Sequence, residues 1–197
     1  MGASRNMGGK KLSQVALFCD CLVHPWDLLQ FQEIIDDGQL AHVTHAGHHI
    51  FSSLEFNGRK CVVIIHKNCA QHRIKVCDYI ATRHMIVVIF TLHGLRCTVS
   101  SFYLPCIAHS TERYDQAVDE LISNIHEAEK IKIPKKFAGA KEPWLHISGG
   151  DANVTLSAEH SDDLCVGSGV PCRDLHKADK QKRRIRAIKF LSLCQAL

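Results

Sequence analysis

The spacing of apolar and polar residues predicts strands over most of the first half of the chain. Extended apolar runs favour strands over 27–34, 48–54, 60–66, 84–92 and 95–104. Gly58 and the pair His93-Gly94 mark turns between neighbouring runs. A helix is expected before these strands, over 11–23, and it must end before Pro25.

The second half of the chain changes to a helical period. From Tyr114 to Ile125 apolar residues recur every three or four positions, and Ser110 or Thr111 can cap this helix. A loop rich in Lys, Gly and Pro is expected over 130–143, then a short strand over 144–148 and a last helix over 181–197. The order helix, strands, helix, strand, helix predicts an α/β (α+β) layered domain.

Composition fits one globular domain spanning all 197 residues, with 46% hydrophobic and 22% charged residues. The longest apolar stretch, Met85 to Phe90, is far shorter than the roughly 18 residues of a membrane-spanning helix, so no membrane segment is expected. The ten cysteines include no pair with two-residue spacing. Reduced thiols are therefore expected, and with them an intracellular location, nuclear or cytoplasmic.

The strongest local signal is the strand that runs into Gly149-Gly150-Asp151-Ala152-Asn153. Two glycines let the backbone turn sharply and let a substrate approach, and alternation along an extended backbone puts Asp151 and Asn153 on one side. Asp and Asn after two glycines are also ordinary turn residues, so this motif alone does not identify a site.

Two other positions add candidate ligands. Glu33 ends an apolar run, and Asn6 precedes Met7-Gly8-Gly9 near the N-terminus. Two carboxylates and amides around one cavity are what Mg²⁺ prefers, because it takes oxygen ligands and is completed by water and substrate phosphate.

Four ordered segments resemble the motifs of the endonuclease/exonuclease/phosphatase family, which includes deoxyribonuclease I-like enzymes, apurinic/apyrimidinic endonucleases and the endonuclease domains of non-LTR retrotransposons. They are Arg5-Asn6-Met7-Gly8-Gly9, Leu29-Gln30-Phe31-Gln32-Glu33, Ser100-Ser101-Phe102-Tyr103-Leu104-Pro105 and Ser148-Gly149-Gly150-Asp151-Ala152-Asn153. The stretches around Gly47-His48-His49 and Cys61–Lys67 look like the retrotransposon branch. The resemblance implies a four-layered α/β sandwich: two packed mixed β-sheets with helices outside.

The resemblance also implies roles for individual residues. Glu33 would be the principal Mg²⁺ ligand, with Mn²⁺ as an alternative metal, and Asn6 a helper at the metal. Tyr103 would contact the phosphate, Asp151 would orient or deprotonate the attacking water, and Asn153 would hold the site in place. The implied activity is that of a metal-dependent DNA endonuclease, with DNA as partner and a reverse transcriptase in a longer polyprotein.

The sequence departs from the family pattern at its C-terminal end. The family closes with a Ser-Asp-His motif that is not found here, and the nearest string, His160-Ser161-Asp162, has another order. We therefore expect a domain that is truncated at the C-terminus and lacks its last strands, with little or no activity. The oligomeric state is not indicated.

Two other functions stay open. A catalytically inactive nucleic-acid-binding module is indicated by seven basic residues within thirteen positions, among them Lys182, Arg183, Arg184 and Arg186, although a solvated helix face explains them too. A Cys/His metal-binding protein is the other alternative, because His42, His45, His48 and His49 gather in one stretch, which we expect to be a loop entering a strand.

Overall fold

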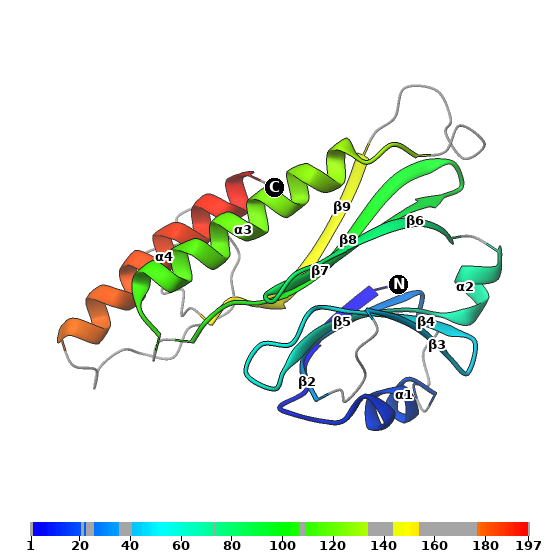
Figure 1. Ribbon diagram of the computed structural model, residues 1–197, viewed down its shortest axis with the longest axis horizontal. Helices are drawn as coiled ribbons and strands as arrows, with labels where there is room; N and C mark the ends of the chain where they lie inside the picture. Colours follow the sequence, from blue (N-terminus) through cyan, green and yellow to red (C-terminus); the bar gives the residue numbers. More distant parts are fainter. Residues whose placement is uncertain are drawn as a thin grey trace. The chain divides into compact units, whose positions relative to one another are not determined.

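The computed structural model describes residues 2–20, 22, 26–35, 41–72, 74–106, 109–133, 144–153 and 177–196. The chain forms two compact units: the first is Met1–Tyr103 with Asn124–Asp151, and the second is Leu104–Ser123 with Ala152–Leu197. All described strands belong to the first unit (Figure 1).

The first sheet has five strands in the order β1-β2-β5-β4-β3. The pair β1–β2 is parallel and the other pairs are antiparallel, so the sheet is mixed. The helix α1 (Leu12–Asp20) covers one face, where Val15 and Cys19 pack with apolar residues of β2, β4 and β5. The strands are β1 (Gly2–Asn6), β2 (Leu28–Ile34), β3 (His42–His45), β4 (His48–Ser52) and β5 (Lys60–Ile65).

The second sheet has four strands in the order β6-β7-β8-β9, with only β8–β9 parallel. A short helix, α2 (Lys67–His72), lies between the two sheets in the sequence. Arg96 on β8 donates hydrogen bonds to the carbonyls of Ala128 and Ile131, which fixes the end of α3 (Thr111–Lys130) to this sheet. The strands are β6 (Ile74–Ala81), β7 (Met85–Leu92), β8 (Leu95–Tyr103) and β9 (Trp144–Asp151).

The two sheets pack face to face around one apolar core. On β5, Cys61, Val63 and Ile65 join apolar residues of β7 and β8, while Val62 and Ile64 join the cluster under α1. Alternating side chains of a strand point to opposite faces, so a strand that is buried on both faces must be apolar throughout. The expected architecture of two packed mixed sheets with helices is confirmed.

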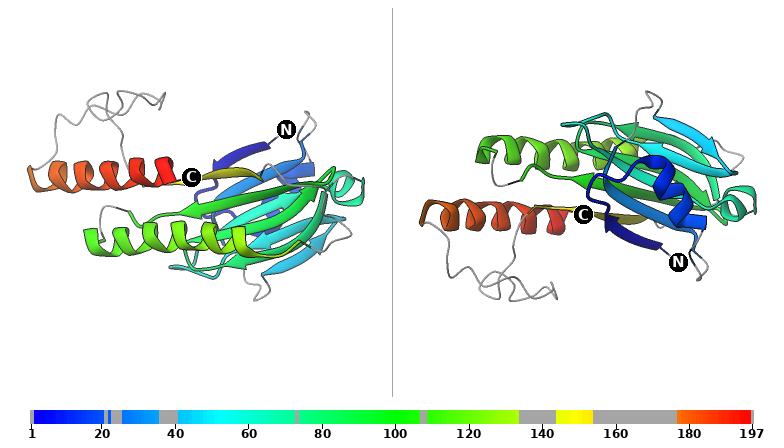
Figure 2. Two further views of the ribbon diagram at one scale, coloured as in Figure 1. Left: turned by 90° about the horizontal axis from the view of Figure 1, so that it is seen from above. Right: turned by 90° about the horizontal axis from the view of Figure 1, so that it is seen from below.

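The strands β1 and β9 lie next to each other, each at the edge of its own sheet (Figure 2). A cavity of about 540 Å³ lies between the sheets on this side, and Ser4, Gln30, Ile147 and Gly149 are among its lining residues. On β9, Leu145 and Ile147 are 51% and 37% exposed, which is high for large apolar side chains.

The second unit contains the first part of α3 and the helix α4 (Lys177–Ala196). The hydroxyl of Ser110 accepts a hydrogen bond from the Arg113 N–H at 3.2 Å, so Ser110 is the N-cap of α3. Lys189 on α4 and Asp119 on α3 form an ion pair at 2.7 Å.

Most expected elements are confirmed, but several elements were not predicted. The expected loop at His42 is the strand β3, which joins β4 through a two-residue turn with positive φ at Ala46 and Gly47. This geometry is that of a type I′ turn, the usual hairpin connection. The structure also adds β1, α2 and β6, and β9 runs three residues past the expected end. The expected loop falls mostly on 134–143, outside the described residues, as does His160-Ser161-Asp162.

No helix in the described part of the chain is both long and apolar enough to cross a bilayer.

Candidate functional site

The first feature of the site is a hydrogen bond between the ends of β1 and β9. Asn6, the last residue of β1, donates from Nδ2 to Oδ2 of Asp151, the last residue of β9, at 2.7 Å. The Asn6 side chain is fixed from the other side as well, because its Oδ1 accepts a hydrogen bond from the Gly8 N–H at 2.9 Å. The Asp151 carboxylate is therefore oriented by an amide that is itself held by the backbone.

Glu33 is linked to the same place by a backbone hydrogen bond from the turn that follows β1. Asn6 pairs with Gln32 in the parallel β1–β2 register, and the Gly9 N–H donates to the Glu33 carbonyl at 2.8 Å. Glu33 itself has φ 56° and lies where the β2–β5 register shifts between Phe31 and Ile34. A non-glycine residue in the left-handed region costs about 1–2 kcal/mol, so the fold holds this half-buried carboxylate in a strained conformation.

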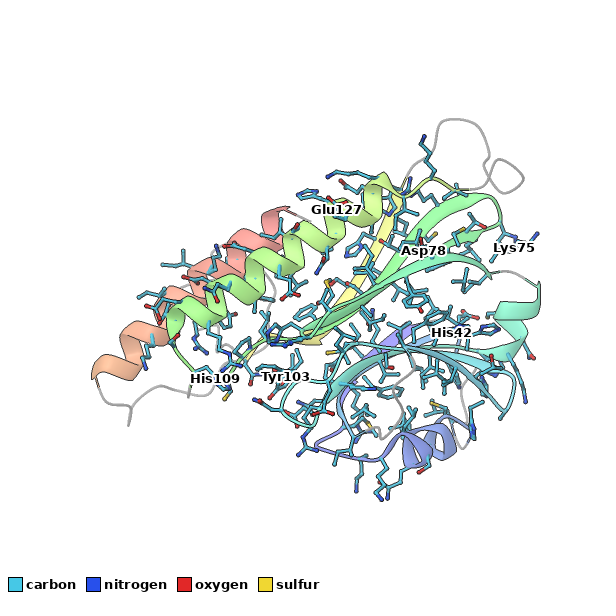
Figure 3. The ribbon with its side chains drawn as sticks, in the orientation of Figure 1. His42, Lys75, Asp78, Tyr103, His109 and Glu127 are labelled. Atoms are coloured by element: carbon cyan, nitrogen blue, oxygen red, sulfur yellow. The ribbon has the colours of Figure 1, made fainter. Side chains whose placement is uncertain are left out.

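Tyr103 completes the group at the end of β8. It is paired with Asp151 in the parallel β8–β9 register, and its ring packs against the inter-sheet core. Figure 3 places Tyr103 at the opposite end of the second sheet from Lys75. Four strands thus bring Asn6, Glu33, Tyr103 and Asp151 to their carboxyl ends, where parallel strands expose functional groups.

Gly149 and Gly150 have a different role from the one expected. Both lie inside β9 and neither has positive φ, so they do not form a turn. A Cβ on Gly149 would clash with Oε1 of Gln30 and lie 2.9 Å from the Ser4 Cβ, and a Cβ on Gly150 would clash with the carbonyl of Phe102. The glycines are needed because the strands approach closely, not because the backbone turns.

Polar residues inside β2 support the site, and the sequence analysis did not identify them. Gln30 donates to the Ser100 carbonyl at 3.0 Å, and Gln32 donates to the hydroxyls of Ser4 and Ser101 at 3.1 and 3.0 Å. Both glutamines are buried. Their signal was the alternation of Gln30 and Gln32 with apolar residues ahead of Glu33, which points both amides at the other sheet.

Asn153 belongs to the second unit, and its partner there is a backbone group. Its Nδ2 donates to the Leu104 carbonyl at 2.6 Å, while the hydroxyl of Tyr114 donates to the Ala152 carbonyl at 3.1 Å. Asn153 has φ 47°, which asparagine tolerates better than most residues. The bond joins the segments that follow β8 and β9.

The four basic residues expected to contact nucleic acid all lie on α4, and the two whose side chains are described differ in how deeply they are buried. Arg186 is buried: its guanidinium donates to the carbonyls of Pro105, His109 and Ser110 and lies 4.6 Å from the Tyr114 ring centroid. That position leaves Arg186 no surface for a phosphate, so its role is to hold α4 in the second unit. Lys182 is half-buried, and the side chains of Arg183 and Arg184 lie outside the described ones.

Histidines and cysteines do not form a metal site in the described part of the chain, where no group of three or more His, Cys, Asp or Glu side chains could hold an ion. His42 and His49 stack on neighbouring strands with Nε2 and Nδ1 3.1 Å apart, and burial lowers the pKa of His42, as does His49. Burial raises the pKa of the Cys61 thiol, which keeps it protonated and unreactive.

Solved structures share this fold. The endonuclease domain of TRAS1, a telomere-specific non-LTR retrotransposon, matches with a TM-score of 0.51 and 19% identity, over 79% of this chain and 59% of that one. An endonuclease/exonuclease/phosphatase family protein from Bacteroides thetaiotaomicron matches with a TM-score of 0.51 and 11% identity, over 78% and 62% of the two chains. A mannosyl-6-phosphatase from Bacteroides thetaiotaomicron VPI-5482 gives 0.50 and 11%, over 79% and 66%.

The chain therefore has the endonuclease/exonuclease/phosphatase fold that its motifs resemble, and it spans 59–66% of the length of these three structures. Neither the family models nor the curated proteins match the sequence.

Proposed function

We propose that this chain is a metal-dependent phosphodiesterase-type hydrolase that acts on DNA. The observation that carries the proposal is the convergence of Asn6, Glu33, Tyr103 and Asp151 at the ends of four strands, with Asn6 bonded to Asp151. Two carboxylates and an amide at strand ends of this fold form a set suited to phosphate chemistry.

The donor chemistry of these residues fits Mg²⁺, with Mn²⁺ as an alternative. Glu33 and Asp151 offer carboxylate oxygens, and the amide oxygen of Asn6 has a second lone pair beside the one used by the Gly8 N–H. Glu33 would be the main ligand, helped by Asn6. A bound Mg²⁺ would neutralise charge on the phosphate and on the leaving oxygen.

The remaining chemistry comes from the protein. Asp151 would orient a water molecule for in-line attack and take its proton, and the hydrogen bond from Asn6 keeps that carboxylate in one orientation. The Tyr103 hydroxyl would contact the phosphate, and Asn153 would hold the segments that follow β8 and β9. Precise placement matters because a small displacement of a catalytic group lowers the rate strongly.

DNA is favoured over a small sugar phosphate by charge next to the site. Arg5, Lys10 and Lys11 are exposed in the segment that carries Asn6. Several cations beside one phosphate-binding centre suit a polyanion, which presents many phosphates at once. A reverse transcriptase in the same polyprotein remains part of this proposal, supported by the fold shared with a retrotransposon endonuclease domain.

The test is cleavage of supercoiled plasmid and of bis(4-nitrophenyl) phosphate with Mg²⁺, Mn²⁺ or EDTA. Protein is kept in excess over DNA, because we expect slow cleavage. Glu33→Gln and Asp151→Asn should each abolish metal-dependent cleavage. The matched control is Asp78→Asn, an exposed carboxylate in the middle of β6, which is the edge strand opposite β9 in the second sheet (Figure 3).

The outcomes separate the candidate functions. Cleavage that survives in Glu33→Gln and Asp151→Asn would overturn the proposed centre. DNA binding with no metal-dependent cleavage of either substrate would favour the inactive binding module. Hydrolysis of bis(4-nitrophenyl) phosphate without cleavage of plasmid would move the substrate from DNA to a smaller phosphate.

A further inference from the structure

Arg59 is held against the turn that follows Asn6, whose Gly9 N–H is hydrogen-bonded to the Glu33 carbonyl. A Cβ built on Gly9 would clash with Nη1 of Arg59 and lie 2.8 Å from its Cζ and 2.9 Å from its Nη2. The guanidinium therefore occupies the space that any other residue at position 9 would fill. Gly9 has φ 82°, which also favours glycine there.

The backbone around Arg59 is fixed. Phe56 and Arg59 exchange backbone hydrogen bonds of 2.8 and 3.0 Å across a turn with positive φ at Asn57 and Gly58. Arg59 immediately precedes β5, whose first residue, Lys60, pairs with Ile34 next to Glu33. The side chain thus starts beside the bulge that carries Glu33.

The turn beneath the guanidinium is tied to two residues of the proposed centre. The Gly8 N–H donates to Asn6 Oδ1 at 2.9 Å, and the Gly9 N–H donates to the Glu33 carbonyl at 2.8 Å. The Arg59 guanidinium packs against Gly9, so its charge lies beside the turn whose N–H groups fix Asn6 and Glu33.

Arg59 has donor capacity that the fold does not use. Its Nη1 is buried and has no hydrogen-bond partner, and none of the ion pairs in the described part of the chain includes Arg59. Glu55, on the same hairpin, instead accepts a hydrogen bond from the Gly58 N–H at 3.1 Å. A buried unpaired guanidinium N–H is unfavourable. Unlike Arg186, Arg59 as a whole is only half-buried, so a small rotation of its side chain would bring the guanidinium to an arriving anion.

We propose that Arg59 is a substrate-positioning residue that binds a phosphodiester group of a DNA strand beside Glu33. The planar guanidinium presents parallel N–H groups that match two phosphate oxygens, which a lysine ammonium does not reproduce. Gly9 makes this subsite possible because it has no side chain. This inference rests on the proposed function for the choice of DNA as ligand.

The two neighbouring glycines provide a matched pair of variants. Gly9→Ala adds a methyl group that must displace the Arg59 guanidinium, whereas a Cβ on Gly8 meets nothing within 4 Å. Both positions have positive φ, 82° and 55°, so both variants carry backbone strain, and thermal melts give its size in each. Only Gly9→Ala should move Arg59, and comparison of the two separates phosphate binding from strain.

The experiment measures affinity for a fluorescein-labelled DNA duplex by anisotropy over a series of salt concentrations, in EDTA. We expect Arg59→Gln to weaken binding about tenfold at low salt and to reduce the slope of log K against log salt by about one, because one phosphate contact is lost. Gly9→Ala should do the same, and Arg59→Lys should regain part of the affinity. Gly8→Ala and the charge control Lys75→Gln, at the far end of β6, should stay within about twofold. Thermal melts establish that each variant is folded.

Equal salt slopes for the wild type, Arg59→Gln and Gly9→Ala would overturn the inference and leave Arg59 a packing residue, as would a wild type that binds no duplex. Hydrolysis of bis(4-nitrophenyl) phosphate is measured separately. If the wild type hydrolyses the diester with metal but Arg59→Gln has the wild-type salt slope, only the Arg59 subsite is refuted. If Arg59→Gln has a reduced salt slope but the wild type shows no hydrolysis, only the hydrolase is refuted.

Discussion

Asn6 and Asp151 are 145 positions apart in the sequence, yet the amide of one donates a 2.7 Å hydrogen bond to the carboxylate of the other. The bond joins the edge strand of one sheet to the edge strand of the other. It therefore fixes the orientation of a candidate base and the relative position of two strand ends at the same time.

This bond predicts a metal-dependent change in stability for Asn6→Asp. The substitution replaces the donor by a second carboxylate facing Asp151, and like charges at this distance repel. We expect unfolding free energy to fall by about 1–2 kcal/mol without metal and to recover partly in Mg²⁺. Thermal melts with and without Mg²⁺ measure this, with Asn6→Ala as the control that removes the bond without adding charge. A Mg²⁺ response no larger in Asn6→Asp than in Asn6→Ala would contradict it.

The strained backbone at Glu33 predicts an unusual order of stabilities. At φ 56° alanine keeps the strain and glycine relieves it, so Glu33→Gly should be more stable than Glu33→Ala by about 1 kcal/mol. Both variants lose the carboxylate and should lose cleavage. The comparison is made by urea unfolding.

Thr44, an exposed residue of β3 without positive φ, provides the control for this order. There the glycine variant should be less stable than the alanine variant, because glycine weakens an ordinary strand. If the alanine variant were the more stable one at Glu33 as well as at Thr44, the backbone at Glu33 would not be strained.

The elements that were predicted best are those whose own pattern of apolar and polar residues determines whether they form a helix or a strand. The helix α3 has an apolar stripe and the Ser110 cap, and the core strands β5, β7 and β8 are apolar runs. The strands β1 and β6 were missed because each is an edge strand: Gly2–Asn6 has almost no apolar residues, and β6 contains Lys75 and Asp78. Pairing with a neighbour, rather than their own composition, makes these segments strands.

The site shows the same division. Asn6, Glu33, Tyr103 and Asp151 were identified through motifs, and their meeting at strand ends follows from the parallel pairs β1–β2 and β8–β9. Arg59 has no motif. Its position depends on the space above Gly9, which only the folded chain defines.

A half-buried histidine on β9 predicts acid sensitivity. His146 contacts the hydroxyls of Thr98 and Ser100, and burial lowers its pKa from 6.5, although Glu129 opposes this. Because the unfolded chain then binds more protons than the folded one, stability is full above about pH 6.5 and falls as the pH decreases below it. Urea unfolding between about pH 7.5 and 5.5 should show the fall.

His146→Gln should reduce this pH dependence, since glutamine does not titrate. Some dependence should remain, because burial also lowers the pKa of His42. An identical fall in the wild type and His146→Gln would assign the acid sensitivity to other groups.

The buried position of Arg186 on α4 predicts that this residue contributes to the stability of the fold and not to DNA affinity. Its guanidinium donates to three backbone carbonyls, at 2.9, 2.9 and 3.2 Å, including that of the α3 cap residue Ser110. Arg186→Lys cannot reach all three and leaves buried acceptors unpaired, so we expect a loss of about 2–4 kcal/mol. The control is Lys189→Gln, which removes the surface ion pair with Asp119 and should cost less than about 1 kcal/mol. Chemical unfolding gives both values, and DNA affinity measured on the folded fraction should be unchanged in each. A folded Arg186→Lys protein of normal stability with weakened DNA binding would restore Arg186 to a nucleic-acid surface.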